Sequence, residues 1–237
     1  MNRVHLLILL LFASFASFSQ ERNKVSIGYI ETYEKLPEIR LQKTSAAEYE
    51  QHKPGKTLVK LKLKETKSQF QIRAKGKQYW FKKYDPQASG DGFKGFGFFG
   101  YFPKLKMYVL SSNATSEHLG FSDLILLDSL SNYRYTIVSI GDAAVETPVP
   151  SVNSRYLLYF YNEVYNVNNC TIAILKVNDR KVPSKLLTEY QYFKTDKWSV
   201  DQVRWIDDHS FLIKALVSRK ENSQRSEHFE YYKAQLN

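Results

Sequence analysis

The segment Val200–Ser218, VDQVRWIDDHSFLIKALVS, is the stretch that decides the fold class. Val203 and Trp205 are expected on one face of this segment, and their neighbours in the chain on the other. The same alternation resumes at Phe211. A period of two is typical of a β-strand with one buried face. The polar residues Asp207–Ser210 separate the two runs, and Asp and Ser favour tight turns because they hydrogen-bond to their own backbone. The segment therefore predicts a β-hairpin.

The same turn also resembles a metal or acid/base site, because Asp207, Asp208 and His209 are adjacent. Adjacent residues in one turn point their side chains apart, whereas metal sites usually gather ligands from several elements or from one helical face. We therefore interpret the three residues as a turn. No catalytic, cofactor-binding or metal-binding residue is assigned from the sequence.

Strand patterns of this kind recur along the chain. The clearest is Thr57–Thr66, TLVKLKLKET, in which Val59, Leu61 and Leu63 alternate with lysines. Further runs rich in β-branched and aromatic residues predict strands at 68–74, 77–84, 106–112, 122–128, 133–140, 155–163, 170–177, 185–193, 201–206, 210–218 and 226–234. The only helix signal is a capping box, Ser45 with Glu48. The fold class is therefore all-β.

Three similar units suggest how these strands are organised. They begin at Lys106, Arg155 and Ser210, so they are spaced by 49 and 55 residues, close to the period of about 40–50 in propeller blades. Each unit is an apolar strand, a polar loop and further apolar strands. We expect an antiparallel meander in blade-like units, as a small or incomplete β-propeller, with a β-sandwich as the alternative. Residues 97–237 carry the blade-like pattern and residues 20–96 are less regular.

Two segments resemble strands of TolB-like propeller blades. PVPSVNSRYLLYFYN, at 148–162, is similar to a P-x-x-S-P-D-x-K-x-L strand start, and it departs from that pattern at Asn153, where the aspartate is absent. VDQVRWIDDHSFLI, at 200–213, is similar to V-x-x-V-x-W-x-D-D-x-x-L-x-V. Together with FFGYFPKLKMYVL, at 98–110, they also resemble uncharacterised secreted proteins of Bacteroidetes. The resemblance covers roughly residues 97–237 and implies a fold and an envelope location, without a shared chemistry.

The first 19 residues have the layout of a secretory signal peptide. Arg3 precedes the short apolar run Leu6–Ala13, and the small residues of Ser17–Ser19 form a cleavage site. Residues 20–237 are then expected to form a single β-rich domain, exported to the periplasm or outside the cell. We expect it to be soluble, without a transmembrane segment and without a lipid anchor. The only cysteine, Cys170, opens an apolar strand and is expected to be buried.

Charge and aromatic content bear on possible partners. The net charge is +10, and loss of residues 1–19 removes Arg3 and no acidic residue, leaving +9. Basic proteins are attracted to anionic surfaces, but the lysines are dispersed, so nucleic acid is an unlikely partner. The stretch Tyr156–Val167, YLLYFYNEVYNV, begins with a strand that is apolar on both faces: one face carries Tyr156, Leu158 and Phe160, and the other carries Leu157, Tyr159 and Tyr161. It is therefore either a central strand covered on both sides or an exposed tyrosine patch.

Two features of the sequence could indicate an enzyme, a glycine motif and a set of separate carboxylates, and both are better explained as parts of strands, loops or turns. GFGFFG matches G-x-G-x-x-G at Gly95, Gly97 and Gly100, but Pro103 and another strand follow where a dinucleotide site needs a helix. We therefore expect no dinucleotide cofactor. The surrounding stretch 85–100 could instead be a surface recognition loop. Hydrolytic carboxylates that meet only in the fold are the second possibility, and the candidates are Glu163, Asp179, Asp196 and Asp201.

These observations favour an exported, non-enzymatic binding protein of the cell envelope, whose partner is an unknown protein or glycan. One alternative is a secreted or periplasmic hydrolase. Another is an inhibitor or immunity-type protein. An enzyme should bring two or three ionisable groups together in one pocket, whereas a binding module should present aromatic and polar groups without such convergence.

Overall fold

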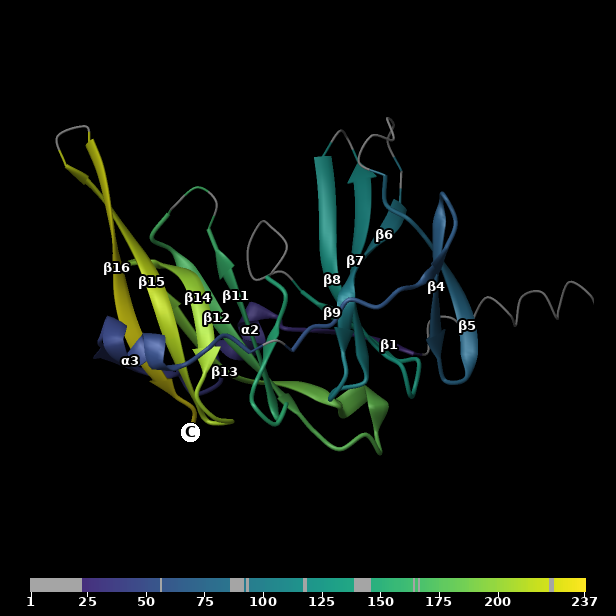
Figure 1. Ribbon diagram of the computed structural model, residues 1–237, viewed down its shortest axis with the longest axis horizontal. Coiled ribbons are helices and arrows are strands. Elements are labelled where there is room, and N and C mark those ends of the chain that lie inside the picture. The colour runs from purple at the N-terminus through teal and green to yellow at the C-terminus, as the bar shows by residue number, and fades with distance from the viewer. Residues whose placement is uncertain are drawn as a thin grey trace, which may run out of the picture.

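The computed structural model of the protein describes residues 23–55, 57–85, 92, 94–116, 119–138, 146–163, 165, 167–221 and 224–237. The signal-peptide prediction and part of the 85–100 stretch lie outside these residues. Figure 1 shows two groups of strands, with β11–β16 on the left and β4–β8 on the right. No helix in the described part of the chain is long and apolar enough to cross a membrane.

The strands form four sheets, which we name A to D. Sheet A has the order β1-β9-β8-β7-β6, with β1 at Lys24–Ile27, β6 at Lys94–Phe102, β7 at Met107–Ser116, β8 at Leu119–Asp128 and β9 at Arg134–Ile137. Sheet B has the order β10-β11-β12-β13, at Val149–Pro150, Tyr156–Asn162, Cys170–Val177 and Leu187–Thr195. A 3₁₀ turn, η1 at Pro183–Lys185, precedes β13.

Sheet C has the order β14-β15-β16-β2, with β14 at Ser199–Trp205, β15 at Ser210–Glu221, β16 at Gln224–Gln235 and β2 at Arg40–Thr44. Sheet D has the order β3-β4-β5, at Lys64–Glu65, Gln69–Ala74 and Lys77–Lys82. None of these sheets closes on itself among the described residues. The all-β, antiparallel prediction is confirmed, apart from β1, which pairs parallel to β9. Propeller closure stays a prediction.

The three predicted units correspond to consecutive strands of one sheet each. The first is β7-β8-β9, the second is β11-β12-β13, and each is preceded in its sheet by a further strand, β6 or β10. The third unit has only β15 and β16 after β14, and its fourth strand is β2, from the N-terminal region. The pairing runs from Tyr231 opposite Thr44 to Gln235 opposite Arg40. The less regular N-terminal region therefore completes a sheet of the C-terminal region.

The opening hairpin and the single helix signal are both confirmed. β14 and β15 pair antiparallel, and Trp205 lies opposite Phe211. The helix is α3 at Ala46–Gln51, where the Ser45 side chain accepts a hydrogen bond of 3.1 Å from the backbone N–H of Glu48. A second short helix, α2 at Ile30–Tyr33, was not predicted.

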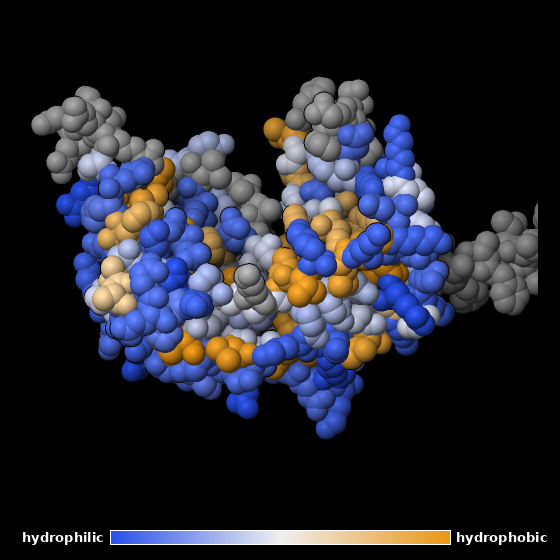
Figure 2. Space-filling view, in the orientation of Figure 1, coloured by the Kyte–Doolittle hydropathy of each residue, from blue (hydrophilic) through white to orange (hydrophobic). Residues whose placement is uncertain are grey.

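The predicted strand at Thr57–Thr66 is wrong over most of its length. Only Lys64–Glu65 is a strand, and Val59 makes an isolated bridge to Tyr101 of β6. The segment crosses in front of sheet A on its way to β4, and Figure 2 shows hydrophobic residues at the surface in this region. Val59 is 37% exposed and Leu61 is 38% exposed, so the alternation does not lead to a buried face here.

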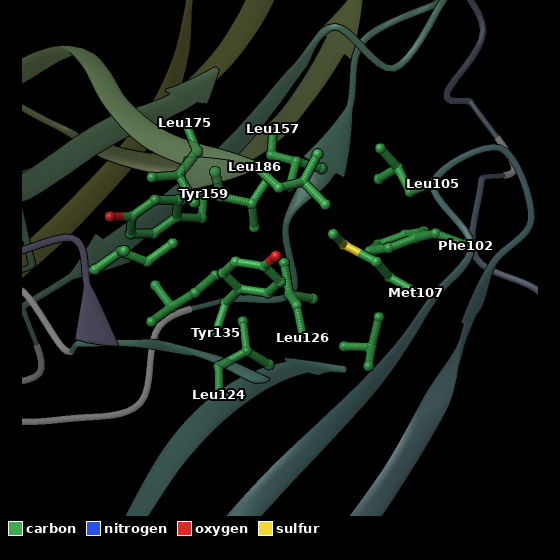
Figure 3. Packing of buried hydrophobic residues seen from close by; sticks show 14 of the residues in the cluster. Phe102, Leu105, Met107, Leu124, Leu126, Tyr135, Leu157, Tyr159, Leu175 and Leu186 are labelled. Atoms are coloured by element: carbon green, nitrogen blue, oxygen red, sulfur yellow. The ribbon is translucent and has the colours of Figure 1, made fainter. Parts of the chain in front are cut away.

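Three hydrophobic clusters join the sheets in the order D, A, B, C. The first cluster, between sheets D and A, includes Phe70 and Leu127. The second lies between sheets A and B, where Figure 3 shows Met107, Leu126 and Tyr135 facing side chains of sheet B. The third lies between sheets B and C and includes Trp198, Phe211 and Leu158. The layers of this fold are therefore held together by apolar packing between neighbouring sheets.

The strand β11 is a central strand with both faces covered. Leu157 and Tyr159 belong to the cluster between sheets A and B, whereas Tyr156 and Leu158 belong to the cluster between sheets B and C. Tyr159 is fully buried, and its hydroxyl donates to the hydroxyl of Tyr33 at 3.0 Å. The tyrosines of the strand, Tyr156, Tyr159 and Tyr161, therefore form no exposed patch.

The glycines of GFGFFG lie in β6 and permit close contacts with the chain that crosses it. A Cβ on Gly95 would lie 2.6 Å from Tyr84 Cα and 2.7 Å from Lys83 O. Since these are backbone atoms, they cannot move away as a flexible side chain does. The motif opens no helix, because the chain continues in β6 to Phe102.

Replacing Gly95 with alanine is expected to lower the free energy of unfolding by about 1–3 kcal/mol through overpacking. The matched control is Gly120→Ala in β8, because a Cβ there meets no atom within 4 Å. That variant should stay within about 0.5 kcal/mol of the parent protein. Urea denaturation of both variants tests the explanation, and equal stabilities would contradict it.

Candidate binding site

A groove of about 700 Å³ opens between sheets B and C. We name it the intersheet groove. Its lining comes from β2, the β11–β12 loop, β13, the β13–β14 turn, β15 and β16, namely from Leu41, Lys43, Asn168, Phe193, Thr195, Lys197, Trp198, Val217, Arg219, Glu230 and Tyr232. The volume lies within the range of about 300–1,000 Å³ found for ligand pockets.

One side of the intersheet groove is a wall of three aromatic rings, Phe193, Trp198 and Tyr232. The Phe193 and Trp198 centroids lie 5.7 Å apart with an interplanar angle of 14°, and those of Trp198 and Tyr232 lie 5.1 Å apart at 26°. Trp198 is buried between the other two, which are half-buried. The wall therefore offers partly exposed aromatic surface on a rigid base.

The charged residues of the groove are three cations and one carboxylate. The cations Lys43, Lys197 and Arg219 form what we name the cationic rim. The carboxylate, Glu230, accepts a hydrogen bond from Tyr232 Oη and lies 3.2 Å from Lys43 Nζ. These partners hold the pKa of Glu230 below its usual range, the Tyr232 hydrogen bond contributing most. Glu230 is thus ionised at neutral pH and orients Tyr232 and Lys43.

A side-chain amide fixes the loop at one end of the groove. Asn168, between β11 and β12, donates from Nδ2 to Ser218 O at 2.7 Å, and its Oδ1 accepts from Ser218 N at 2.9 Å. This double hydrogen bond joins the loop of sheet B to β15 of sheet C. The two walls of the groove are therefore held at a defined separation before any ligand binds, which reduces the entropic cost of binding.

The four candidate hydrolytic carboxylates do not share one site. Glu163 follows β11 and Asp196 follows β13, whereas Asp179 follows the antiparallel strand β12 and so lies at the opposite end of sheet B. Asp201 lies in sheet C and pairs with Lys214 at 2.9 Å. Asp179 is exposed and pairs with Lys181 at 3.2 Å. No group of three or more His, Cys, Asp or Glu suited to a metal occurs in the described residues.

The two aspartates of the opening hairpin have different roles. Asp207 caps its own turn and accepts hydrogen bonds from His209 N at 2.6 Å, Ser210 N at 2.7 Å and Ser210 Oγ at 2.8 Å. Asp208 is only 7% exposed and points away from the turn, toward the β10–β11 turn of sheet B. The two side chains diverge, as expected from the sequence. The interpretation of Asp208 as an ordinary turn residue was nevertheless incomplete.

Cys170 is fully buried at the start of β12, in agreement with the sequence prediction. Burial raises the pKa of its thiol to about 12, against a smaller opposing effect of a hydrogen bond with the Val200 backbone. A thiol of this kind is neither a nucleophile nor a metal ligand at neutral pH.

The intersheet groove has no signature in the sequence, because its residues come from six separate stretches. Lys43 lies in a region that seemed irregular, and its strand β2 was not predicted. The one available signal was the cluster of aromatics and lysines at 190–198, YQYFKTDKW. Comparison with protein-family models, curated protein sequences and solved structures finds no match to this chain.

Proposed function

We propose that the protein is an exported, non-enzymatic binding protein of the cell envelope that binds an acidic glycan in the intersheet groove. One observation carries the proposal: a wall of three aromatic rings and a cationic rim line the same groove. Aromatic rings bind the C–H faces of sugar rings, and lysine and arginine donate to carboxylate and sulfate groups. The overall positive charge, +10 in the full chain, also attracts polyanions.

The same groove offers little support for the hydrolase alternative. Glycoside hydrolysis uses two carboxyl groups about 5–10 Å apart on either side of the scissile bond. The described lining of the groove contains one carboxylate, Glu230, and its partners Tyr232 and Lys43 already hold it. A general acid needs a raised pKa, whereas the pKa of Glu230 is lowered. Binding without turnover is the function that fits this arrangement.

Export rests on the layout of residues 1–19, which lie outside the described residues. Fractionation of cells that express a tagged copy tests it directly. The tagged chain should be found in the periplasm or the medium at the size of residues 20–237. A cytoplasmic chain of full length would contradict export, without bearing on the glycan site.

Replacing Lys197 with glutamate is expected to weaken the binding of hexagalacturonate about tenfold, because it reverses one charge of the cationic rim and leaves the aromatic wall in place. The matched control is Lys194→Glu, which makes the same charge change at an exposed position of β13 outside the groove. Isothermal titration calorimetry at low salt measures both, and cellohexaose serves as the neutral probe.

The proposal predicts tight binding of hexagalacturonate, weaker binding of cellohexaose and a selective effect of Lys197→Glu. Equal losses in the two variants would indicate attraction by overall charge alone and would remove the site. Release of new reducing ends from either oligosaccharide would support the hydrolase alternative instead. Absence of binding to both oligosaccharides at millimolar concentration would refute the glycan proposal.

A further inference from the structure

A second pocket lies where the edge strands β6 of sheet A, β10 of sheet B and β14 of sheet C meet. It encloses about 460 Å³ and is separate from the intersheet groove, with which it shares no lining residue. Its walls are the end of β6 at Phe102, the strand β10 and the end of β14 at Trp205. Lys53, Gly55, Thr57 and Val59, on the way from α3 toward β3, complete its lining. We name it the central pocket.

Hydrogen bonds fix the parts of the central pocket relative to one another. Val59 exchanges two backbone hydrogen bonds of 2.9 Å with Tyr101, which hold this part of the lining on β6. The contact is close, because a Cβ on Gly100 would lie 2.8 Å from Val59 O. Trp205 Nε1 donates to Val149 O at 2.9 Å and so joins β14 to β10. The pocket is therefore largely formed in advance, as small-molecule sites usually are.

The chemistry of the central pocket is apolar inside and cationic at its rim. The interior side chains include Phe102, Val149 and Trp205. Two lysines, Lys53 and Lys104, belong to the lining, and none of the described lining residues is acidic. Lys104 Nζ donates to Val152 O at 2.8 Å, so that its charge is held beside the pocket. An ammonium group that has only one protein acceptor retains donors for an anionic ligand.

We propose that the central pocket binds a small amphipathic anion, an acyl chain that ends in a carboxylate, as in a fatty acid. The chain would fill the apolar interior, and the carboxylate would accept hydrogen bonds from Lys104 and Lys53. A cationic ligand is disfavoured, because the described lining has two lysines that would repel it and no acidic residue that would pair with it. This inference does not depend on the glycan site, because the two sites have different walls and different residues.

Decanoate, decanol and decyltrimethylammonium test the inference by calorimetric titration of the protein below their micellar concentrations. Decanoate should bind at least about fivefold more tightly than decanol, and the cation should bind most weakly. Lys104→Gln should weaken decanoate binding about threefold to tenfold and leave decanol binding unchanged, since it removes the charge and keeps a long polar side chain. Comparison of the three ligands thus separates the contribution of the carboxylate charge from that of the alkyl chain.

A matched pair of valines tests the location. Val152 lines the pocket and is 47% exposed, and Val182 lies before η1 outside the pocket and is 49% exposed. Val152→Glu places a negative charge at the rim and should abolish decanoate binding, whereas Val182→Glu should not change it. Equal binding of decanoate and decanol, equal effects of the two glutamates, or no binding at millimolar decanoate would each overturn the inference.

Discussion

Replacing Asp208 with alanine is expected to lower the free energy of unfolding by about 2–3 kcal/mol, because it removes hydrogen bonds to a charged group and leaves a buried donor without an acceptor. Asp208 Oδ1 accepts from Ser151 Oγ at 2.7 Å and from Asn153 N at 2.8 Å. Its Oδ2 accepts from Asn153 Nδ2 at 3.0 Å and lies 3.6 Å from Arg155 Nε. The carboxylate thus ties the hairpin of sheet C to the β10–β11 turn of sheet B.

The cost arises from the donors that alanine leaves behind. Ser151 is 1% exposed, and its Oγ also accepts from the backbone N–H groups of Arg155 and Tyr156, each at 3.1 Å. Without Asp208, the buried Ser151 hydroxyl loses its acceptor. A buried polar group without a partner costs about 1–3 kcal/mol, and the backbone N–H of Asn153 loses the same acceptor.

Asp207→Ala is the matched control, since it removes the neighbouring carboxylate from the same turn. Asp207 bonds only within its own turn, so its loss should cost about 1 kcal/mol, comparable to the loss of a helix cap. Urea denaturation followed by tryptophan fluorescence measures both variants. A cost for Asp208→Ala no larger than that for Asp207→Ala would show that the tie between the sheets contributes little.

The same contacts predict how stability depends on pH. Burial acts to raise the pKa of Asp208, but the hydrogen bonds from Asn153 and Ser151 and the charge of Arg155 outweigh it, so that its pKa is lowered. A carboxyl group with a lowered pKa in the folded state stabilises the protein above its unfolded pKa of about 3.9, and this stability is lost as the pH falls through the folded value. Asp208→Ala should therefore lose less stability than the parent protein between pH 4 and pH 2.

The sequence predicted those elements that local patterns determine. The hairpin around Asp207, the helix cap at Ser45 and the burial of Cys170 each depend on a few adjacent residues, and all three were correct. The predicted strand at Thr57–Thr66 was wrong because alternation only permits a strand, and the chain here lacks a neighbour with which to pair over most of its length. Pairing partners are a tertiary property.

The candidate sites depended on contacts that no local pattern specifies. The strand β2 joins β16 across most of the chain, so that Lys43 reaches the intersheet groove beside Tyr232. Asp208 and Asn153 are 55 residues apart in sequence and belong to different sheets. Asn153 lies in the turn before β11 and Asp208 in the turn between β14 and β15, and these two turns meet through this contact. A single sequence shows neither pairing.

A second buried carboxylate ties sheet A to sheet B, and its loss is the other large effect that we expect. Asp128, at the end of β8, is 1% exposed and lies 2.6 Å from Nη1 of Arg180, between β12 and β13. Asp128 also accepts from Leu130 N at 3.1 Å and Ser131 Oγ at 2.7 Å. Asp128→Ala should lower the free energy of unfolding by about 2–3 kcal/mol, because it removes hydrogen bonds to a buried charged group, whereas the Arg180 side chain is 32% exposed.

The loss from Asp128→Ala has two parts, the interaction with Arg180 and the hydrogen bonds from the local donors. A double-mutant cycle with Arg180→Ala separates them. Arg180→Ala leaves the buried Asp128 charge with only its local donors, and the double variant removes that uncompensated charge. We therefore expect the double variant to be more stable than the sum of the single losses predicts, with a coupling energy of at least about 1.5 kcal/mol. Urea denaturation of the four proteins provides the values.

The control cycle uses the pair Asp179–Lys181, which belongs to the same loop as Arg180. Its side chains are 63% and 87% exposed, so the pair is solvated and its coupling should be at most about 0.5 kcal/mol. The two ion pairs differ in how far their side chains are buried. Both cycles involve the same loop and are measured by the same method on the same unfolding transition. If the coupling of Asp128 with Arg180 were as small as that of Asp179 with Lys181, the ion pair would contribute little to joining the two sheets. A large difference would show that burial, and not the presence of an opposite charge nearby, decides how much an acidic residue that pairs with this loop contributes to stability.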